Sequence, residues 1–279
     1  MNWYFSLKFS KLNTSSQGIN IALYNKKFKS ICLDLGLDVK HFGNIDGYPI
    51  LLSCPQKLKP NNKNMLIVSG FHGEEIAGPL GILEFLKYLN KKDLENINLS
   101  IIPTLNPWGL EHHIRNNKDG LKTNLLFDTE KSIYTPSGVG QLLKSNSSLL
   151  KELGKTVIVD LHENVESNSF YLYVYNRLNN DLEITENKDL LEIVLQSGKR
   201  HFPVRLDGTY QDSFAKRDIY EIKNGIVNNF YDGSFDDYVS RVLGCPLVIV
   251  NETPGKDELS KRLEAQSDMI GSIFLLFML

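Results

Sequence analysis

The sequence has little cysteine, almost no excess charge and no long apolar run, and each shortage excludes a class of protein. Three cysteines in 279 residues are too few for a disulfide framework or a cysteine-rich zinc module, and they fit a reducing compartment. A net charge of −2 provides no positive field to attract nucleic acid or an anionic membrane. The apolar stretch 269–279 is shorter than the roughly 20 residues that span a bilayer.

The N-terminal segment also lacks the uninterrupted apolar run and the small-residue cleavage site of a signal peptide. We therefore expect a cytoplasmic protein with neither a nucleic-acid nor a membrane partner. What is present is the composition of one soluble globular domain, with 42% hydrophobic and 23% charged residues. A chain of this length can bury a large core without a structural metal. Because cysteine is scarce, any metal site must use histidine and carboxylate ligands.

Apolar strands alternate with amphipathic helical segments along the chain, which is typical of an α/β protein. We predict a single domain with a mostly parallel or mixed twisted sheet and helices on both faces. The predicted strands are a pair within 39–53 that turns at 46–47, then 65–68, 99–105, 156–161, 170–175 and 246–251. The predicted helices are 75–89, 138–150, 189–196, 234–243 and the segment from 256 onward.

Polar side chains follow three of the predicted buried strands, in the segments 69–75, 160–164 and 251–255. In open α/β sheets, ligands bind outside the carboxyl ends of the strands. Two imidazoles and several carboxylates at neighbouring strand ends could therefore meet in one pocket. Two histidines and one carboxylate, with a fourth position open, are the ligand set of a catalytic zinc ion.

His72 and Glu75 are three residues apart where a strand gives way to a helix, so both side chains can face one ion. A second interpretation stays open, in which His72 belongs to a turn and Glu74 and Glu75 complement the positive end of the following helix. His162 likewise fits either a ligand or a hydrogen-bonded residue at a strand end. The adjacent His112 and His113 face different ways and are not expected to be ligands.

Two longer motifs make the pattern specific. The segment Asn106-Pro107-Trp108-Gly109 is followed by Arg115, Asn117 and Gly120, and Gly233-Ser234-Phe235-Asp236 precedes a strand that ends in Glu252. In this order the motifs resemble those of the zinc carboxypeptidase superfamily, the M14-like metallopeptidases. This superfamily is related to murein-peptide amidases and to the succinylglutamate desuccinylase/aspartoacylase group. The resemblance implies a zinc carboxypeptidase-like catalytic domain at 61–279, with 1–60 as an extension packed on it or continuous with it.

The resemblance also assigns roles to individual residues. It implies that His72, Glu75 and His162 hold one Zn²⁺ ion and that Glu252 is the base and proton shuttle. Carboxylates suit that role because they can take a proton from water and deliver it to a leaving amine. Arg115 would stabilise an oxyanion. Taken alone, Glu252 could instead cap the closing helix, and Arg115 could be a solvated loop residue.

The substrate-binding residues implied by the resemblance are Asn124 and Tyr231, together with Arg115. The family pattern departs at two nearby positions. Leu125 stands where the family has an arginine that grips the substrate carboxylate, and Lys122 stands where it has an aspartate that orients the first zinc histidine. Asp160 is a candidate to replace that aspartate. Loss of the arginine removes a charge-assisted contact to a terminal carboxylate.

These observations predict a zinc-dependent hydrolase that cleaves an amide or peptide bond in a small peptide or related substrate, as metallocarboxypeptidases do. The short spacing between His72 and His162 leaves little room for long substrate-binding loops, which favours a small substrate. One alternative is an N-acyl amino-acid deacylase resembling succinylglutamate desuccinylase and aspartoacylase. The other is a non-catalytic ligand-binding protein on the same fold.

Overall fold

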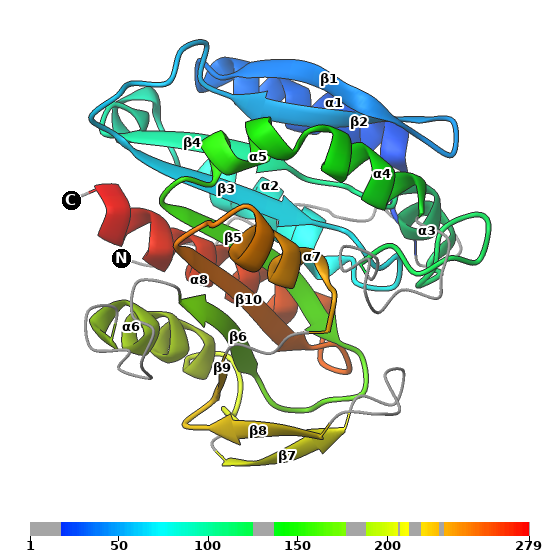
Figure 1. The fold of residues 1–279 in the computed structure, drawn as a ribbon, viewed down its shortest axis with the longest axis vertical. Coiled ribbons are helices and arrows are strands. Elements are labelled where there is room, and N and C mark those ends of the chain that lie inside the picture. Colours follow the sequence, from blue (N-terminus) through cyan, green and yellow to red (C-terminus); the bar gives the residue numbers. More distant parts are fainter. Residues whose placement is uncertain are drawn as a thin grey trace.

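A computed structural model of the chain describes residues 18–124, 137–176, 188–205, 207–211, 219–228 and 232–278. These residues form a ten-stranded mixed sheet in the order β1-β2-β4-β3-β5-β10-β6-β9-β8-β7 (Figure 1). The strands are β1 (Asp38–Ile45), β2 (Tyr48–Cys54), β3 (Lys63–Ser69), β4 (Ile97–Ile102), β5 (Val157–Asn164), β6 (Tyr171–Asn176), β7 (Asp207–Gln211), β8 (Ile219–Lys223), β9 (Ile226–Asn228) and β10 (Leu247–Pro254). The central strands β4, β3, β5 and β10 run parallel to one another.

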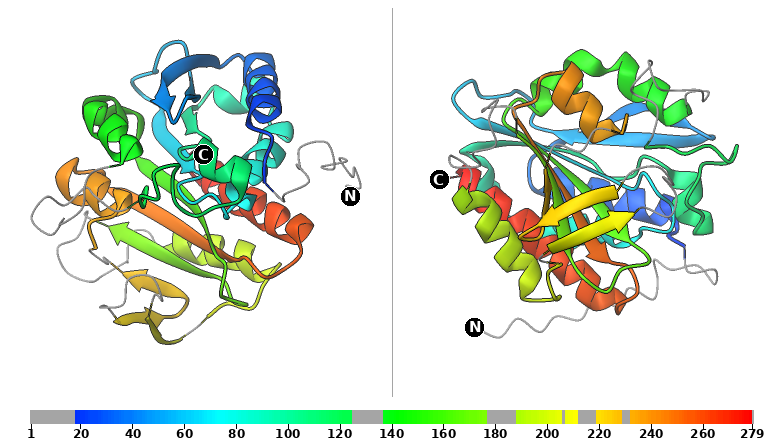
Figure 2. Two further views of the ribbon diagram at one scale, coloured as in Figure 1. Left: turned by 90° about the vertical axis from the view of Figure 1, so that its right-hand side faces the viewer. Right: turned by 60° about the horizontal axis from the view of Figure 1, so that its bottom comes forward.

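Helices cover both faces of the sheet, as Figure 2 shows. On one face lie α1 (Ile21–Asp34), α2 (Ala77–Lys87), α6 (Lys188–Lys199) and α8 (Leu259–Met278), and on the other α4 (Gly138–Ser145), α5 (Ser147–Leu153) and α7 (Phe235–Asp237) with the π-helical turn Tyr238–Val242. The short helices α3 (Pro107–His112) and Lys91–Leu94 connect strands to helices. The predicted α/β fold with both faces covered is confirmed.

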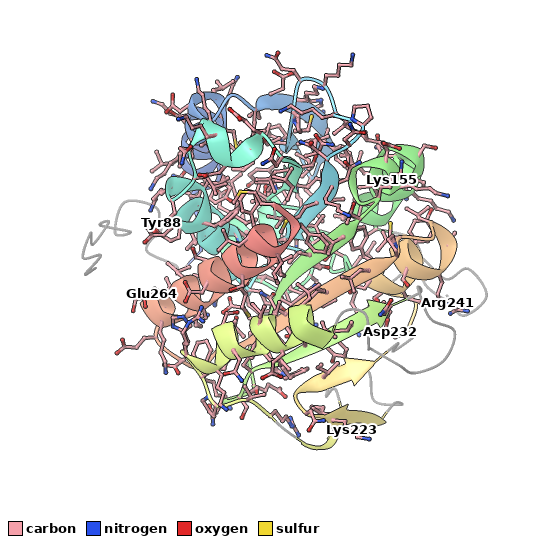
Figure 3. All side chains as sticks on the ribbon, turned by 90° about the vertical axis from the view of Figure 1, so that its left-hand side faces the viewer. Tyr88, Lys155, Lys223, Asp232, Arg241 and Glu264 are labelled. Atoms are coloured by element: carbon pink, nitrogen blue, oxygen red, sulfur yellow. The ribbon has the colours of Figure 1, made fainter. Side chains whose placement is uncertain are left out.

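Successive side chains of a strand point to opposite faces of the sheet. Each central strand therefore contributes residues to the hydrophobic core on either face. In β5, Val157 and Val159 belong to the core that includes α2 and α8, whereas Ile158 belongs to the core that includes α4 and α5. Figure 3 shows these two sides of the molecule, with Tyr88 and Glu264 on one and Lys155 and Arg241 on the other. A strand that is buried on both faces has a nearly continuous apolar sequence. For this reason β3 and β5 could be predicted from the sequence.

Two strands extend further than predicted. The parallel pairing of β5 with β10 continues through His162 and Glu252, which are partners in register, to Asn164 and Pro254. Both functional candidates therefore lie within strands and not in the loops after them.

Other boundaries differ for local reasons. The predicted helix 138–150 is two helices, because the Asn146 side chain bonds back to the Leu142 carbonyl and its backbone leaves the helical conformation. β4 ends at Ile102, before Pro103, which has no N–H for the ladder. The hairpin β8–β9 was not predicted, although Asn224-Gly225 at its turn has the positive φ angles typical of hairpin turns.

The N-terminal elements extend the same sheet. β1 and β2 form the predicted hairpin, with Asp46 and Gly47 at positive φ, and β2 pairs with β4. Helix α1 packs against α2, where the Tyr24 hydroxyl donates a hydrogen bond of 2.8 Å to the Pro79 carbonyl. None of the helices in the described part of the chain has the length and apolarity needed to cross a membrane.

Candidate metal centre

The turn after β3 carries His72 and Glu75. Gly70 takes a φ of +72°, which turns the chain away from the sheet, and the Glu75 amide donates to the His72 carbonyl. At Gly73 the turn lies directly against α3, where an added Cβ would be 2.1 Å from the Gly109 carbonyl carbon. This close approach requires glycine and fixes the neighbouring His72.

His162 and Glu252 come from adjacent strands, β5 and β10, and lie side by side in register. Two-residue periodicity points Asp160 and His162 to the same face of β5. The His162 ring is 3% exposed as a side chain and lies parallel to the Phe71 ring, with centroids 6.0 Å apart.

His72, Glu75 and His162 meet at one point. The Nδ1 atom of His72 is 2.6 Å from Glu75 Oε1, and the Nδ1 atom of His162 is 2.8 Å from Glu75 Oε2. All three ligand atoms lie within 4.8 Å of one another, and all three residues are buried. Each carboxylate oxygen thus faces one imidazole nitrogen, which is a donor set that fits zinc. The structure brings together the three predicted ligands.

The protonation states of these residues have physical causes. Burial lowers the pKa of His72 to about 4, so its ring is neutral at pH 7. Burial favours a raised pKa for Glu75, but the two histidines outweigh it and hold the pKa of this carboxyl well below its usual value. Burial opposes the charged form of His162, yet the carboxylates of Asp160 and Glu75 raise its pKa well above the usual value. Metal binding would therefore displace a proton from His162.

Arg115 reaches the same place from the loop after α3. Its Nη1 atom donates to Glu74 Oε1 at 2.9 Å and to Glu75 Oε1 at 3.2 Å. The guanidinium therefore lies beside the candidate ligands and lines the cavity next to them. Burial raises the pKa of Glu74, and Arg115 opposes that effect.

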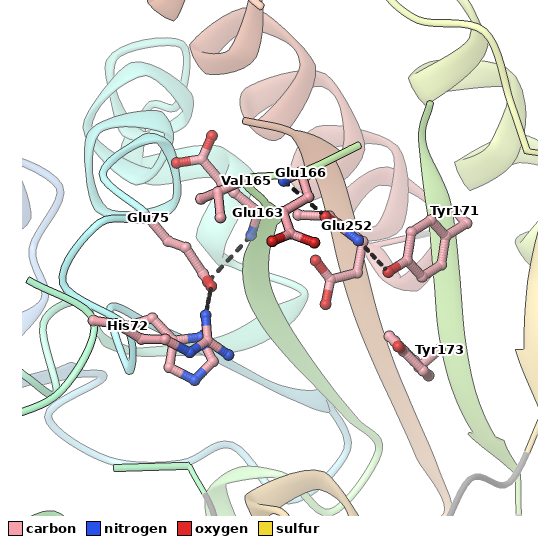
Figure 4. A pocket seen from close by; sticks show the side chains of 10 residues that line it. His72, Glu75, Glu163, Val165, Glu166, Tyr171, Tyr173 and Glu252 are labelled. Atoms are coloured by element: carbon pink, nitrogen blue, oxygen red, sulfur yellow. Dashed lines mark hydrogen bonds and ion pairs between the residues drawn. The ribbon is translucent and has the colours of Figure 1, made fainter. Parts of the chain in front are cut away.

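A cavity of about 50 Å³ opens beside the ligands. Figure 4 shows the Glu252 carboxylate pointing into the space between the His72–Glu75 pair and Tyr173. The cavity is lined by side chains from the turn after β3, the loop after α3, β6, β10 and the carboxyl end of β5 with the residues that follow it. Most of them are charged, amide or aromatic: His72, Glu75, Arg115, Glu163, Asn164, Val165, Glu166, Tyr171, Tyr173 and Glu252. The cavity is therefore small and mostly polar, and it lies next to the candidate metal ligands.

The remaining predicted residues lie elsewhere. The side-chain oxygen of Asn124 accepts a hydrogen bond of 3.2 Å from the Phe235 amide, and Asn124 is not among the residues that line the cavity. Tyr231 and Leu125 lie outside the described residues. His112 is exposed and contacts Trp108, away from the site, in line with its exclusion as a ligand.

The sequence offered Asp160 as a possible partner at the site and gave no role to Glu163. Asp160 contacts His162, because β5 directs positions 160 and 162 to one face. Glu163 points to the other face, where it accepts hydrogen bonds from the Ala77 amide at 2.8 Å and from Arg262 at 2.7 Å. Both contacts could have been predicted by extending the strand through His162, because side chains alternate between the two faces of a strand.

The described fold and site define a class: a carboxypeptidase-like α/β protein with a candidate metal centre at the carboxyl ends of its central strands. Residues 61–214, more than half of the chain, match the family model for the succinylglutamate desuccinylase/aspartoacylase catalytic domain. The chain belongs to this family, which lies within the M14-like superfamily predicted from the motifs. A comparison with curated protein sequences found no match.

Solved structures with a similar fold are described as metallopeptidases or metallo-carboxypeptidases. The chain is similar to a candidate metallopeptidase of Shewanella baltica OS155, with 28% identity over 92% of each chain and a TM-score of 0.80. It is also similar to one of Shewanella amazonensis SB2B, with 26% identity over 92% of this chain and 93% of the other and a TM-score of 0.81. A metallo-carboxypeptidase of Pseudomonas aeruginosa, in complex with (2-guanidinoethylmercapto)succinic acid, shares the fold at 14% identity, with 93% and 69% of the chains covered and a TM-score of 0.65.

Proposed function

We propose that this protein is a zinc-dependent hydrolase that cleaves an amide bond in a small peptide or an acylated amino acid. The observation that carries the proposal is the convergence of His72, Glu75 and His162 beside the cavity that Glu252 lines. Family membership supports a hydrolase of this superfamily. The choice of zinc rests on the donor set of two imidazoles and one carboxylate.

In this proposal the three residues hold the ion, which supplies Lewis acidity to the carbonyl of the scissile amide. Glu252 takes a proton from water in the cavity and delivers it to the leaving nitrogen. Arg115 lies beside Glu75 and stabilises negative charge that develops on the carbonyl oxygen. Asn124 and Tyr231 are assigned to substrate binding on the family resemblance, and the contact of Asn124 with Phe235 links it to the segment before β10.

The family match favours an acylated amino acid over a long peptide, and Leu125 in place of the arginine expected from the family pattern weakens the case for an ordinary carboxypeptidase. We therefore propose an N-acyl amino-acid deacylase as the alternative to a carboxypeptidase-type enzyme. The substrate panel must contain C-terminally free peptides, murein tripeptide, and N-acyl amino acids such as N-succinylglutamate and N-acetylaspartate.

The test is hydrolysis of this panel by zinc-loaded protein and by Glu252→Gln. We expect one substrate class to be cleaved and the variant to lose a factor of about 10²–10⁴ in kcat, because a positioned acid–base group contributes that much. Its zinc content should be unchanged, since Glu252 is not a ligand in the proposal. Glu264→Gln, which replaces an exposed carboxylate of α8, is the matched control.

Two results would contradict the proposal in different ways. Hydrolysis that survives Glu252→Gln would remove Glu252 from its assigned role. No hydrolysis of any substrate by zinc-loaded wild-type protein would overturn the enzyme proposal and favour a ligand-binding protein.

A further inference from the structure

A buried carboxylate contacts the far side of the His162 ring. Nδ1 of His162 faces Glu75, and Nε2 is 3.3 Å from Asp160 Oδ2. Asp160 is fully buried in the centre of the sheet, so its carboxylate needs partners that offset its lost hydration. The imidazole N–H is such a partner.

A second carboxyl group meets Asp160 from the opposite layer. Asp236, at the centre of α7, is buried, and its ligand atom lies within 4.8 Å of those of Asp160 and His162. The position of α7 is set by Ser234, whose hydroxyl accepts from the Asp237 amide, and by the packing of Phe235 on Phe71. The carboxyl pair is therefore held from both the sheet and the helix.

The two candidate histidine ligands differ in the contacts of the ring nitrogen that does not face Glu75. Among the described residues, no hydrogen-bond partner contacts Nε2 of His72, which lies in the tight turn next to Gly73. His162 extends from a strand and depends on side-chain contacts for the angle of its ring. A carboxylate behind a ligating histidine fixes both its tautomer and its orientation.

We propose that Asp160 is a positioning residue for the metal centre. Asp160 accepts the Nε2 proton of His162 and so leaves Nδ1 with its lone pair directed at the metal position. This inference rests on the proposed function, because it concerns the same metal site.

The test compares zinc affinity in wild-type protein, Asp160→Asn and Asp236→Asn, by competition with a chelator of known affinity. We expect Asp160→Asn to weaken zinc binding tenfold to a hundredfold, the usual effect of losing such a partner, and Asp236→Asn to have a smaller effect. The matched control is Asp268→Asn, which changes another aspartate bonded to a histidine Nε2, that of His201 at 2.9 Å, far from the site. Its zinc affinity should be unchanged.

A second measurement needs no variant. In zinc-loaded wild-type protein, proton NMR should show the Nε2 proton of His162 as a slowly exchanging downfield resonance, and its absence would overturn the inference. Unchanged zinc affinity in a folded Asp160→Asn would also overturn it while leaving the proposed function intact. Two metal ions per wild-type chain, with the second lost in Asp160→Asn, would make the carboxyl pair a cation site and overturn it as well. A wild-type protein that binds no zinc would overturn both proposals.

Discussion

At the scale of single residues, Gly73 sets the position of His72. An added Cβ would lie 2.1 Å from both the Gly109 carbonyl carbon and the Ile114 carbonyl oxygen, and neither backbone atom can move without displacing α3 or the Arg115 loop. We expect Gly73→Ala to lower the free energy of unfolding by about 1–3 kcal/mol, the usual cost of overpacking, and to weaken zinc binding. Denaturant unfolding and chelator competition measure the two effects.

Gly271→Ala is the matched control, because Gly271 lies in α8 and an added Cβ there meets nothing within 4 Å. Alanine in a helix interior is favoured over glycine by about 0.5–1 kcal/mol, so this variant should be equally or more stable. Wild-type stability and zinc affinity in Gly73→Ala would show that the turn can relax, against the account given for His72.

The sequence was sufficient to predict the site residues that belong to recognisable motifs. His72, Glu75 and His162 come together as expected, and Arg115 and Glu252 line the adjoining cavity. The contact of Asp160 with His162 instead depends on which face of β5 each residue occupies, and therefore on where β5 ends. Motifs do not carry that information.

At the scale of elements, a partly exposed charge cluster joins α8 to the two residues that directly follow α6. Asp268 of α8 bonds to Arg200 at 3.1 Å and to His201 at 2.9 Å. Burial opposes ionisation of Asp268, but His201 and Arg200 outweigh it and lower its pKa. A carboxyl group with a lowered pKa in the folded state adds stability that is present above its unfolded pKa and is lost as the pH falls through the folded value.

We therefore expect Asp268→Asn to be less stable than wild type at pH 7 by under about 1 kcal/mol, because the pair is solvent-screened. The difference should persist down to about pH 3.9, the usual pKa of aspartate, and shrink below it. Urea unfolding of both proteins at several pH values measures this. A difference that grows as the pH falls below that value would contradict the assigned sign.

The elements themselves were predictable to different degrees. Apolar runs revealed the buried strands, and the Asp46-Gly47 turn revealed the first hairpin. The break at Asn146 was missed because a polar side chain that bonds back to the Leu142 carbonyl looks like any other surface position of a helix. The outer strands β7 to β9 lack the apolar runs that mark the centre of the sheet.

At the scale of the whole molecule, the order of the strands could not be deduced from periodicity. Neighbours such as β5 and β10 are distant in sequence and adjacent only because of how the crossovers are placed. The family resemblance supplied the fold, but it left 1–60 unassigned. We propose that 1–60 is continuous with the main domain, since β2 pairs with β4 in the same sheet.

A chain that starts at residue 61 tests this proposal. It lacks the buried Tyr24 and Phe28 of α1, which belong to the same core as α2, and it exposes the edge of β4. We expect it to unfold without a cooperative transition or to aggregate, because it loses apolar burial and gains an open strand edge. Circular dichroism during thermal unfolding measures this. A cooperative, zinc-binding fragment would instead make 1–60 a separable extension.

The position of β5 has a consequence for the lifetime of the site. β5 has strand neighbours on both sides and helices over both faces, so its amide hydrogens can reach solvent only when the core opens. Local opening events, which release loops and edges on short timescales, do not reach His162. His162 is therefore attached to the segment that opens last, and an ion held there would exchange through the cavity while the sheet stays closed.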